Sequence, residues 1–226
     1  MRLRRYLTAA AVAVTVTACT YLPVKESTIA ALKELPAKSR QAVIVIPDRR
    51  VPYRATVTLW ERPQEAWQMT GKVMAATVGR RGIAPRDSKR EGDGRTPSGT
   101  FDLKRAFGYA KDADTGLDYR MVSTYDFWVD DPTSDQYNRW VRVKPEARSY
   151  ETLRRDDDLY KYAVVVEYNT GPIVRGAGSA IFLHVWKDEN TATAGCIALK
   201  EDHLKQILGW LDAAKNPVIF IRYHDQ

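Results

Sequence analysis

The residues with the clearest potential for chemistry are a cysteine and a histidine in the last quarter of the chain. The sequence has two cysteines, Cys19 and Cys196, and three histidines among 226 residues. A thiol becomes a nucleophile when a nearby base accepts its proton. His184 lies in an apolar run, and the stretch 190–193 would let the chain turn back so that Cys196 lies beside it. This arrangement predicts nucleophilic catalysis, with Cys196 as the nucleophile and His184 as the base.

The surroundings of Cys196 favour this interpretation over that of a buried, inert thiol, which is a common state of free cysteine. Gly195 directly before it permits a tight backbone, and a predicted helix begins a few residues later at Glu201. A helix N-terminus lowers the pKa of a nearby thiol, so we expect a depressed pKa for Cys196. The sequence has no closely spaced pair of cysteines or histidines of the kind that binds zinc, so we expect no metal ion and no cofactor.

The other cysteine follows a stretch that is typical of export. A basic start precedes the apolar, small-residue run Leu7–Ala18, which predicts a signal peptide over residues 1–18. The run ends in VTAC, which resembles the lipobox of bacterial lipoproteins, where the cysteine carries acyl chains. The resemblance implies lipidation at Cys19, attachment to a membrane and a tether over residues 19–41. An ordinary signal peptide with a chance cysteine is the alternative.

Export also decides how the charge of the chain is interpreted. The formal net charge is +7 and the pI about 9.4, but removal of the three arginines of the predicted leader lowers the charge by three, to +4. We therefore expect no nucleic-acid partner and a better match to anionic polymers of the envelope. The expected location is the bacterial cell envelope, on the periplasmic side. In a Gram-negative cell it would be the outer membrane, because Thr20 rather than an aspartate follows the lipidated cysteine.

Composition and hydrophobic patterning predict one mainly β domain. With 44% hydrophobic and 28% charged residues the chain is too apolar to be disordered, and the roughly 208 residues after the leader suffice for one core. The predicted strands, several of which alternate apolar and polar residues, are 42–46, 54–61, 68–78, 121–129, 140–143, 160–168, 180–186 and 217–223. A packed helix is predicted over Glu201–Ala214, and a short N-terminal helix around Ile29, Leu32 and Leu35.

Two motifs resemble the signatures of one enzyme family. The run TAGCIAL at 193–199, with His184 before it, is similar to the Ser/Thr-x-Gly-Cys element of L,D-transpeptidases of the YkuD type. The run GDGRTPSGTF at 92–101 resembles an upstream element of the same family. The resemblance covers residues 42–223 and implies a catalytic domain with a YkuD-like fold, a β-barrel or sandwich of mixed strands.

The resemblance implies acyl transfer on the stem peptides of peptidoglycan. Cys196 would attack the carbonyl between a diamino acid and D-alanine, and an amine of a second stem peptide would then resolve the thioacyl-enzyme. Backbone N–H groups at Gly195 and Cys196 would stabilise the oxyanion, and a carbonyl near Thr193 or Gly195 would orient His184. The expected substrate contacts are Arg95, Thr96, Thr193 and Ala194. The oligomeric state is left open.

Three positions depart from the family pattern. Threonine stands at position 193 where serine is commoner, valine at position 185 where glycine is frequent, and alanine at position 198 where arginine is usual. That arginine is associated with ordering the site or the substrate, and Arg95, Arg175 or Lys200 could supply its charge instead. Two alternatives therefore stay open. One is an L,D-carboxypeptidase, which uses water as the acceptor, and the other is a non-catalytic lipoprotein that binds the wall.

Overall fold

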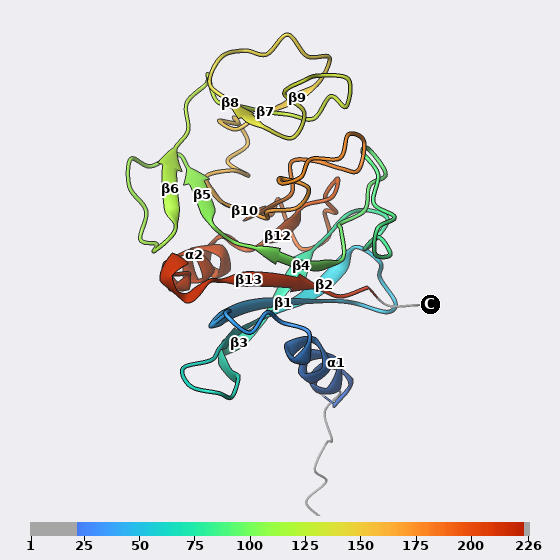
Figure 1. Ribbon diagram of the computed structural model, residues 1–226, viewed down its shortest axis with the longest axis vertical. Coiled ribbons are helices and arrows are strands. Elements are labelled where there is room, and N and C mark those ends of the chain that lie inside the picture. Colours follow the sequence, from blue (N-terminus) through green and yellow to red (C-terminus); the bar gives the residue numbers. More distant parts are fainter. Residues whose placement is uncertain (1–21, 224–226) are drawn as a thin grey trace, which may run out of the picture.

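The computed structural model describes residues 22–223, and side chains from Thr28 onward. The predicted leader, the predicted lipidation site Cys19 and His224 lie outside the described residues. The chain forms a mainly β fold, as predicted, with a ten-stranded sheet, a three-stranded sheet and two α-helices in the described part. Figure 1 shows the small sheet at one end of the molecule and the N-terminal helix near the other. No helix between residues 22 and 223 is long and apolar enough to cross a bilayer.

The ten-stranded sheet is the frame of the molecule. In chain order its strands are β1 (Gln41–Pro47), β2 (Arg54–Glu61), β3 (Gln68–Thr77), β4 (Gly99–Asp102), β5 (Arg105–Gly108), β6 (Asp118–Met121), β10 (Tyr162–Val165), β11 (Phe182–Val185), β12 (Ile197–Leu199) and β13 (Val218–Ile221). Side by side they run β4-β13-β1-β2-β3-β12-β11-β10-β5-β6. The smaller sheet has the order β8-β7-β9, with β7 (Phe127–Val129), β8 (Trp140–Val141) and β9 (Tyr150–Thr152).

Two helices cover the sheet. α1 (Leu22–Lys33) lies against β1, where it closes an apolar cluster with side chains of β1 and β13. α2 (Glu201–Trp210) buries Leu204, Ile207 and Leu208 and packs against β10 and β11. The helical spacing of these three side chains is the signal that predicted α2. The helix ends at Trp210, earlier than predicted, because Asp212 caps a separate 3₁₀ turn over Ala213–Lys215.

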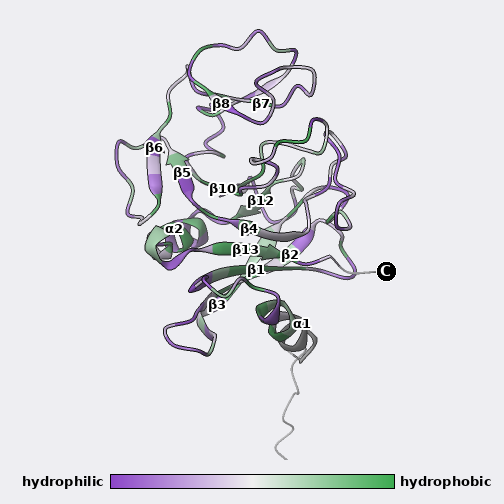
Figure 2. Cartoon of the chain, viewed as in Figure 1, coloured by the Kyte–Doolittle hydropathy of each residue, from purple (hydrophilic) through white to green (hydrophobic). Residues whose placement is uncertain are grey.

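Strand β1 shows how burial follows from the sequence. Its first six residues, QAVIVI, are all buried, because α1 covers one face of the strand and the aliphatic core lies on the other. Figure 2 shows β1 and β13 in hydrophobic colours, whereas β6 and much of the loop structure are hydrophilic.

The long sheet curls toward itself. The amide N–H of Glu167, just after β10, donates to the carbonyl of Asp102 on β4 at 3.1 Å. Strands β4 and β10 are far apart in the order of the sheet, so this hydrogen bond joins two distant regions of it. The largest apolar cluster contains side chains of β1, β2, β3, β10, β11, β12 and α2.

The predicted segment 121–129 is the clearest difference between the sequence-based elements and the structure. It forms parts of two strands, β6 and β7, which belong to different sheets. Between them the carboxylate of Asp126 accepts hydrogen bonds from the backbone N–H and the hydroxyl of Ser123, at 2.8 and 2.7 Å, and so holds a turn. The short strands β4, β5, β9 and β12 were not predicted, because three or four residues carry too little periodicity to be recognised.

Candidate active site

Adjacent strands place the cysteine and the histidine on one face of the sheet. Strands β11 and β12 are parallel neighbours, and His184 pairs with Ala198 in their register. Successive side chains of a strand point to opposite faces, so Ala198 and Cys196, two residues apart, share the face of His184. Both His184 and Cys196 line a pocket of about 220 Å³. This pocket is smaller than most ligand sites, which suits the reacting end of a longer substrate.

His184 is held as a neutral imidazole. Its ring atom Nδ1 lies 2.7 Å from the carbonyl oxygen of Val185. A carbonyl can only accept, so Nδ1 carries the proton and Nε2 keeps its lone pair. Burial lowers the pKa of His184 to about 4, which keeps the ring uncharged at neutral pH. The orienting carbonyl is that of the next residue in the strand, and the expectation that it would come from near Thr193 or Gly195 was wrong.

Cys196 is a protonated, buried thiol. Its side chain is 8% exposed, and its Sγ donates to the carbonyl oxygen of Ala180 at 3.2 Å. Burial raises the pKa of the thiol to about 12, and the negative charge of Glu151 acts in the same direction. The expected lowering by a helix N-terminus was wrong, because strand β12 separates Cys196 from the start of α2.

The two sequence motifs meet at the backbone of the nucleophile. The hydroxyls of Thr193 and Thr96 both donate to the carbonyl oxygen of Cys196, at 2.7 and 3.2 Å. Thr96 also accepts a hydrogen bond from the backbone N–H of Gly79 at 2.9 Å, and its side chain has no exposed surface. An added Cβ at Gly195 would lie 3.0 Å from the carbonyl oxygen of Arg95, so this glycine permits the close approach of the two motifs.

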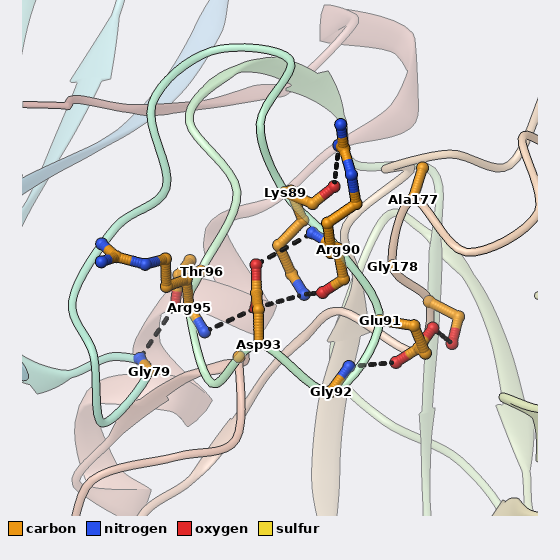
Figure 3. Close-up of polar contacts among 12 residues, drawn as sticks. Gly79, Lys89, Arg90, Glu91, Gly92, Asp93, Arg95, Thr96, Ala177 and Gly178 are labelled. Carbon is orange, nitrogen blue, oxygen red and sulfur yellow. Dashed lines mark hydrogen bonds and ion pairs between the residues drawn. The ribbon is translucent and has the colours of Figure 1, made fainter.

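The loop that carries Thr96 is fastened around one carboxylate, as Figure 3 shows. Asp93 accepts hydrogen bonds from the ammonium of Lys89 and from the backbone N–H groups of Arg90 and Arg95, all within 2.9 Å. Lys89 is 5% exposed, so this ion pair is shielded from water. Through the hydrogen bond from Thr96, the loop therefore holds the backbone carbonyl of Cys196 in place.

A second network fixes the carbonyl of Ala180, which accepts the hydrogen bond of the thiol. Ala180 has the unusual backbone angle φ of 52°, and its N–H donates to the side-chain oxygen of Asn138 at 3.2 Å. Just before it, Ser179 donates to the carboxylate of Glu91 at 2.6 Å, and Tyr137 donates to the same oxygen at 2.6 Å. Loops from three parts of the chain thus converge on the segment that positions the sulfur.

The structure places the other expected site residues as follows. Ala194 and Thr193 line the pocket, and Thr96 lies behind it. Three basic residues could have replaced the arginine that is usual at position 198, and none of them lines the pocket. Arg95 donates to the carbonyl of Ile83. Arg175 forms an ion pair with Asp135, and Lys200 forms one with Asp202. Ala198 does line the pocket.

The charged residues that line the pocket are Glu151, Arg155 and Lys187. Glu151 on β9 and Arg155 in the loop after it were not expected at the site. Neither residue belongs to a motif, and no spacing in the sequence connects them to Cys196. They reach the pocket because the small sheet packs beside it. Within the described part of the chain, no group of three or more side chains could hold a metal ion.

The fold and the site define a mainly β protein with a buried cysteine and a neutral histidine on adjacent strands of a curled sheet. The model of one family, the YkuD L,D-transpeptidase catalytic domain, matches residues 40–220. The chain therefore belongs to the YkuD family of L,D-transpeptidase catalytic domains.

Solved structures of low sequence identity resemble the chain more distantly. Two are crystal structures of the helical cell shape determining protein Pgp2 from Campylobacter jejuni, one of them a point mutant. Both are 15% identical, with TM-scores of 0.39 for the mutant and 0.36 for the other. The similarity covers 89% and 88% of this chain but only 55% and 56% of those chains, so this chain corresponds to little more than half of their length. No curated protein matches the chain.

Proposed function

We propose that the protein is a peptidoglycan L,D-transpeptidase that forms a thioacyl-enzyme on Cys196 and transfers the acyl group to an amine. The observation that carries the proposal is the placement of Cys196 and His184 on one face of β11 and β12, both lining the same pocket. Membership of the YkuD family supplies the substrate class, the stem peptides of peptidoglycan.

In the proposed first step the resting pair is neutral. The thiol gives up its hydrogen bond to the Ala180 carbonyl, and its proton passes to Nε2 of His184 as the sulfur attacks the carbonyl carbon before D-alanine. A C–S bond forms and the C–N bond to D-alanine breaks. The proton on His184 moves to the departing nitrogen, so D-alanine leaves as a neutral amine. Because burial opposes both charges, proton transfer and attack are expected to be coupled rather than to pass through a stable thiolate–imidazolium pair.

Backbone N–H groups next to the sulfur are the proposed oxyanion donors. The N–H of Gly195 donates to the hydroxyl of Thr193 at 3.2 Å, so in this conformation it is already engaged. The N–H of Cys196 is therefore the better candidate of the two expected donors. Such a donor contributes about 3–4 kcal/mol to the transition state in serine proteases.

The decisive experiment incubates the purified protein with muropeptides that carry a tetrapeptide stem. Release of D-alanine by the wild type and its loss in Cys196→Ala are the expected results. Mass spectrometry then distinguishes cross-linked dimers from free tripeptides, which would indicate the carboxypeptidase. Absence of D-alanine release, together with failure of a carbapenem to acylate Cys196, would contradict the proposal and favour a wall-binding lipoprotein.

We further propose that lipid on Cys19 anchors the protein in the cell envelope. The support is the sequence VTAC after an apolar run, since Cys19 lies outside the described residues. Cys19→Ser is expected to release the protein from the membrane fraction of cells. Its retention in that fraction would contradict lipidation.

A further inference from the structure

A pair of oppositely charged side chains in the pocket has no role in the mechanism above. Glu151 on β9 and Arg155 in the following loop both line the pocket of Cys196 and His184. The same two residues also line a hollow of about 490 Å³. The Glu151–Arg155 pair therefore forms the wall between the reacting sulfur and a neighbouring space through which a second substrate can approach.

The carboxylate of Glu151 is fixed beside the catalytic pair. The hydroxyl of Tyr160 donates to its Oε2 at 3.1 Å, and Nη1 of Arg155 lies 3.5 Å from the same oxygen. The ring of Tyr160 packs edge-on against the imidazole of His184, with 5.2 Å between the ring centroids. Burial raises the pKa of Glu151, and the charge of this carboxylate helps to raise the pKa of the Cys196 thiol. Glu151 thus lies within electrostatic range of the sulfur.

The guanidinium of Arg155 is equally well held. Its Nε and Nη2 donate to the two carboxylate oxygens of Asp157 at 2.8 and 2.6 Å, and it lies over the ring of Tyr160 at 5.1 Å. The hydrogen bonds to Asp157 and Glu151 use three of the five N–H donors of a guanidinium, which leaves donors for a ligand. A planar guanidinium suits a carboxylate ligand, with which it can form two parallel hydrogen bonds.

The charge of the neighbouring hollow differs from that of the chain. Its lining contains three carboxylates and two guanidiniums: Glu151, Asp156, Asp157, Arg154 and Arg155. The chain as a whole carries a formal charge of +7. A slightly acidic entrance in a basic protein attracts a cationic group.

We infer that Glu151 and Arg155 together bind the acceptor by an α-amino acid group, which carries an ammonium and a carboxylate on one carbon. Glu151 binds the ammonium and Arg155 the carboxylate, since opposite charges 3.5 Å apart complement the two charges of such a group. This inference rests on the proposed function, because it names the chemical class of acceptor in that reaction. It also gives a role to Glu151, the one carboxylate among the residues that line the Cys196 pocket.

In the transfer step, Glu151 and His184 accept the two protons that the acceptor nitrogen loses. The bound ammonium gives one proton to Glu151, and its nitrogen then attacks the thioester carbonyl. The C–N bond forms, the C–S bond breaks, and the second proton passes from nitrogen through His184 to the sulfur. Glu151 returns its proton to water. A thioester and an ammonium ion thereby become an amide, a thiol and one proton.

The test compares two matched acceptors, glycine and glycinamide, with a tetrapeptide donor. Both have the same amine-bearing carbon, but only glycine has a carboxylate, and the amine of glycinamide is less protonated at neutral pH. Chemistry without recognition would therefore favour glycinamide. We expect the wild type to prefer glycine by at least about tenfold, the effect of one charge-assisted hydrogen bond. The measurement is the amount of each transfer product relative to hydrolysis, by mass spectrometry.

Two variants separate the roles of the pair. Glu151→Gln keeps the shape and the contact with Tyr160, and we expect it to lower transfer to both amines relative to water by about tenfold or more. Arg155→Gln is expected to abolish the preference for glycine over glycinamide while amines still compete with water. Glu65→Gln, an exposed glutamate in the β2–β3 turn, is the control and is expected to match the wild type.

The outcomes distinguish this inference from the proposed function. Equal use of glycine and glycinamide by the wild type would overturn it, and so would an unchanged product ratio in Glu151→Gln. A fall in D-alanine release in Arg155→Gln with an unchanged glycine preference would assign the guanidinium to the donor instead. If the wild type releases no D-alanine, the proposed function fails, and glycine binding measured by saturation-transfer NMR still decides the inference. Loss of glycine binding in Glu151→Gln would support it, and equal binding in both proteins would overturn it.

Discussion

The two faces of the segment β10–β12 have opposite properties, although the same strands form both. On one face Val164, Leu183 and Ile197 belong to an aliphatic cluster closed by α2. On the other face Phe182 and Cys196 belong to an aromatic cluster with Phe107 and Tyr160. Phe107, Tyr160 and Phe182 contact one another edge-on, with centroids 5.2–5.9 Å apart, and Tyr160 also contacts His184. The first face is sealed, whereas the second opens into the pocket of Cys196.

The difference separates a face that serves stability from the face that carries the candidate site. Aliphatic side chains fill a closed space and contribute stability through burial alone. Aromatic side chains bury comparable area, but their hydroxyls and ring edges also hold polar groups in fixed positions. The aromatic face can therefore keep a thiol, an imidazole and a carboxylate uncharged or paired inside the protein. Substitutions on the two faces are expected to separate stability from activity.

The largest effect is expected for Cys196→Ala. Loss of the nucleophile should lower D-alanine release by about a thousandfold or more. The fold should survive, because only one sulfur is removed from a cluster dominated by aromatic rings. Release assays beside thermal melting check both expectations. Substantial turnover by the folded variant would contradict the role of Cys196 as nucleophile.

On the sealed face, Leu183→Ala should cost about 2–5 kcal/mol of unfolding free energy, because a fully buried leucine leaves a cavity. The folded fraction should release D-alanine almost as the wild type does. Phe182→Leu, one residue earlier and on the aromatic face, should lower the unfolding free energy less than Leu183→Ala does. It should lower the rate of D-alanine release more. Chemical denaturation and release assays measure the two effects. If Leu183→Ala lowered the specific activity of the folded fraction more than Phe182→Leu, the separation of the faces would be refuted.

The buried imidazole should make the protein sensitive to acid. The pKa of His184 is lowered to about 4 in the fold, whereas in the unfolded chain it is near 6.5. Between these values the unfolded chain binds more protons, so stability is full above pH 6.5 and decreases as the pH falls toward 4, by about 3 kcal/mol. His184→Gln should lose this component. The measurement is the urea midpoint of both proteins from pH 7 to pH 4.

A parallel decrease of the urea midpoint in the wild type and in His184→Gln would show that other groups cause the acid sensitivity. His203→Gln, on α2 outside the pocket, is the comparison variant. It should keep the D-alanine release of the wild type, whereas His184→Gln should lose it.

The smallest effect concerns the two hydroxyls behind the sulfur. Each of Thr96→Val and Thr193→Val should cost about 1–3 kcal/mol of unfolding free energy. Each variant loses one hydrogen bond to the Cys196 carbonyl and also the acceptor of one backbone N–H group, that of Gly79 or Gly195. The double variant leaves this carbonyl without either bond, so its cost should exceed the sum of the single costs. A double-mutant cycle of unfolding free energies tests this. Strict additivity would show that the two motifs do not cooperate at Cys196.

The adjacency of Cys196 and His184 was the part of the candidate site that the sequence could predict. A histidine in an apolar run, a Gly-Cys step twelve residues later and turn formers between them already indicate adjacency, and the structure pairs the two strands. The direction of the thiol pKa was predicted wrongly. A pKa depends on burial and on distant charges such as Glu151, and neither is a local property of the sequence.

Segment patterning determined the mainly β class, the long strands and α2, because alternation and helical spacing over eight or more residues are strong local signals. The family, too, was visible in two short motifs. Only the tertiary structure decided which groups meet at the sulfur. Glu151 and Arg155 reach the pocket through the packing of the small sheet, and Thr96 reaches the Cys196 carbonyl across one hundred residues of chain. Contacts between residues so far apart in the sequence depend on how the sheet curls. The curl follows from the packing of the whole chain, which local residue propensities do not specify.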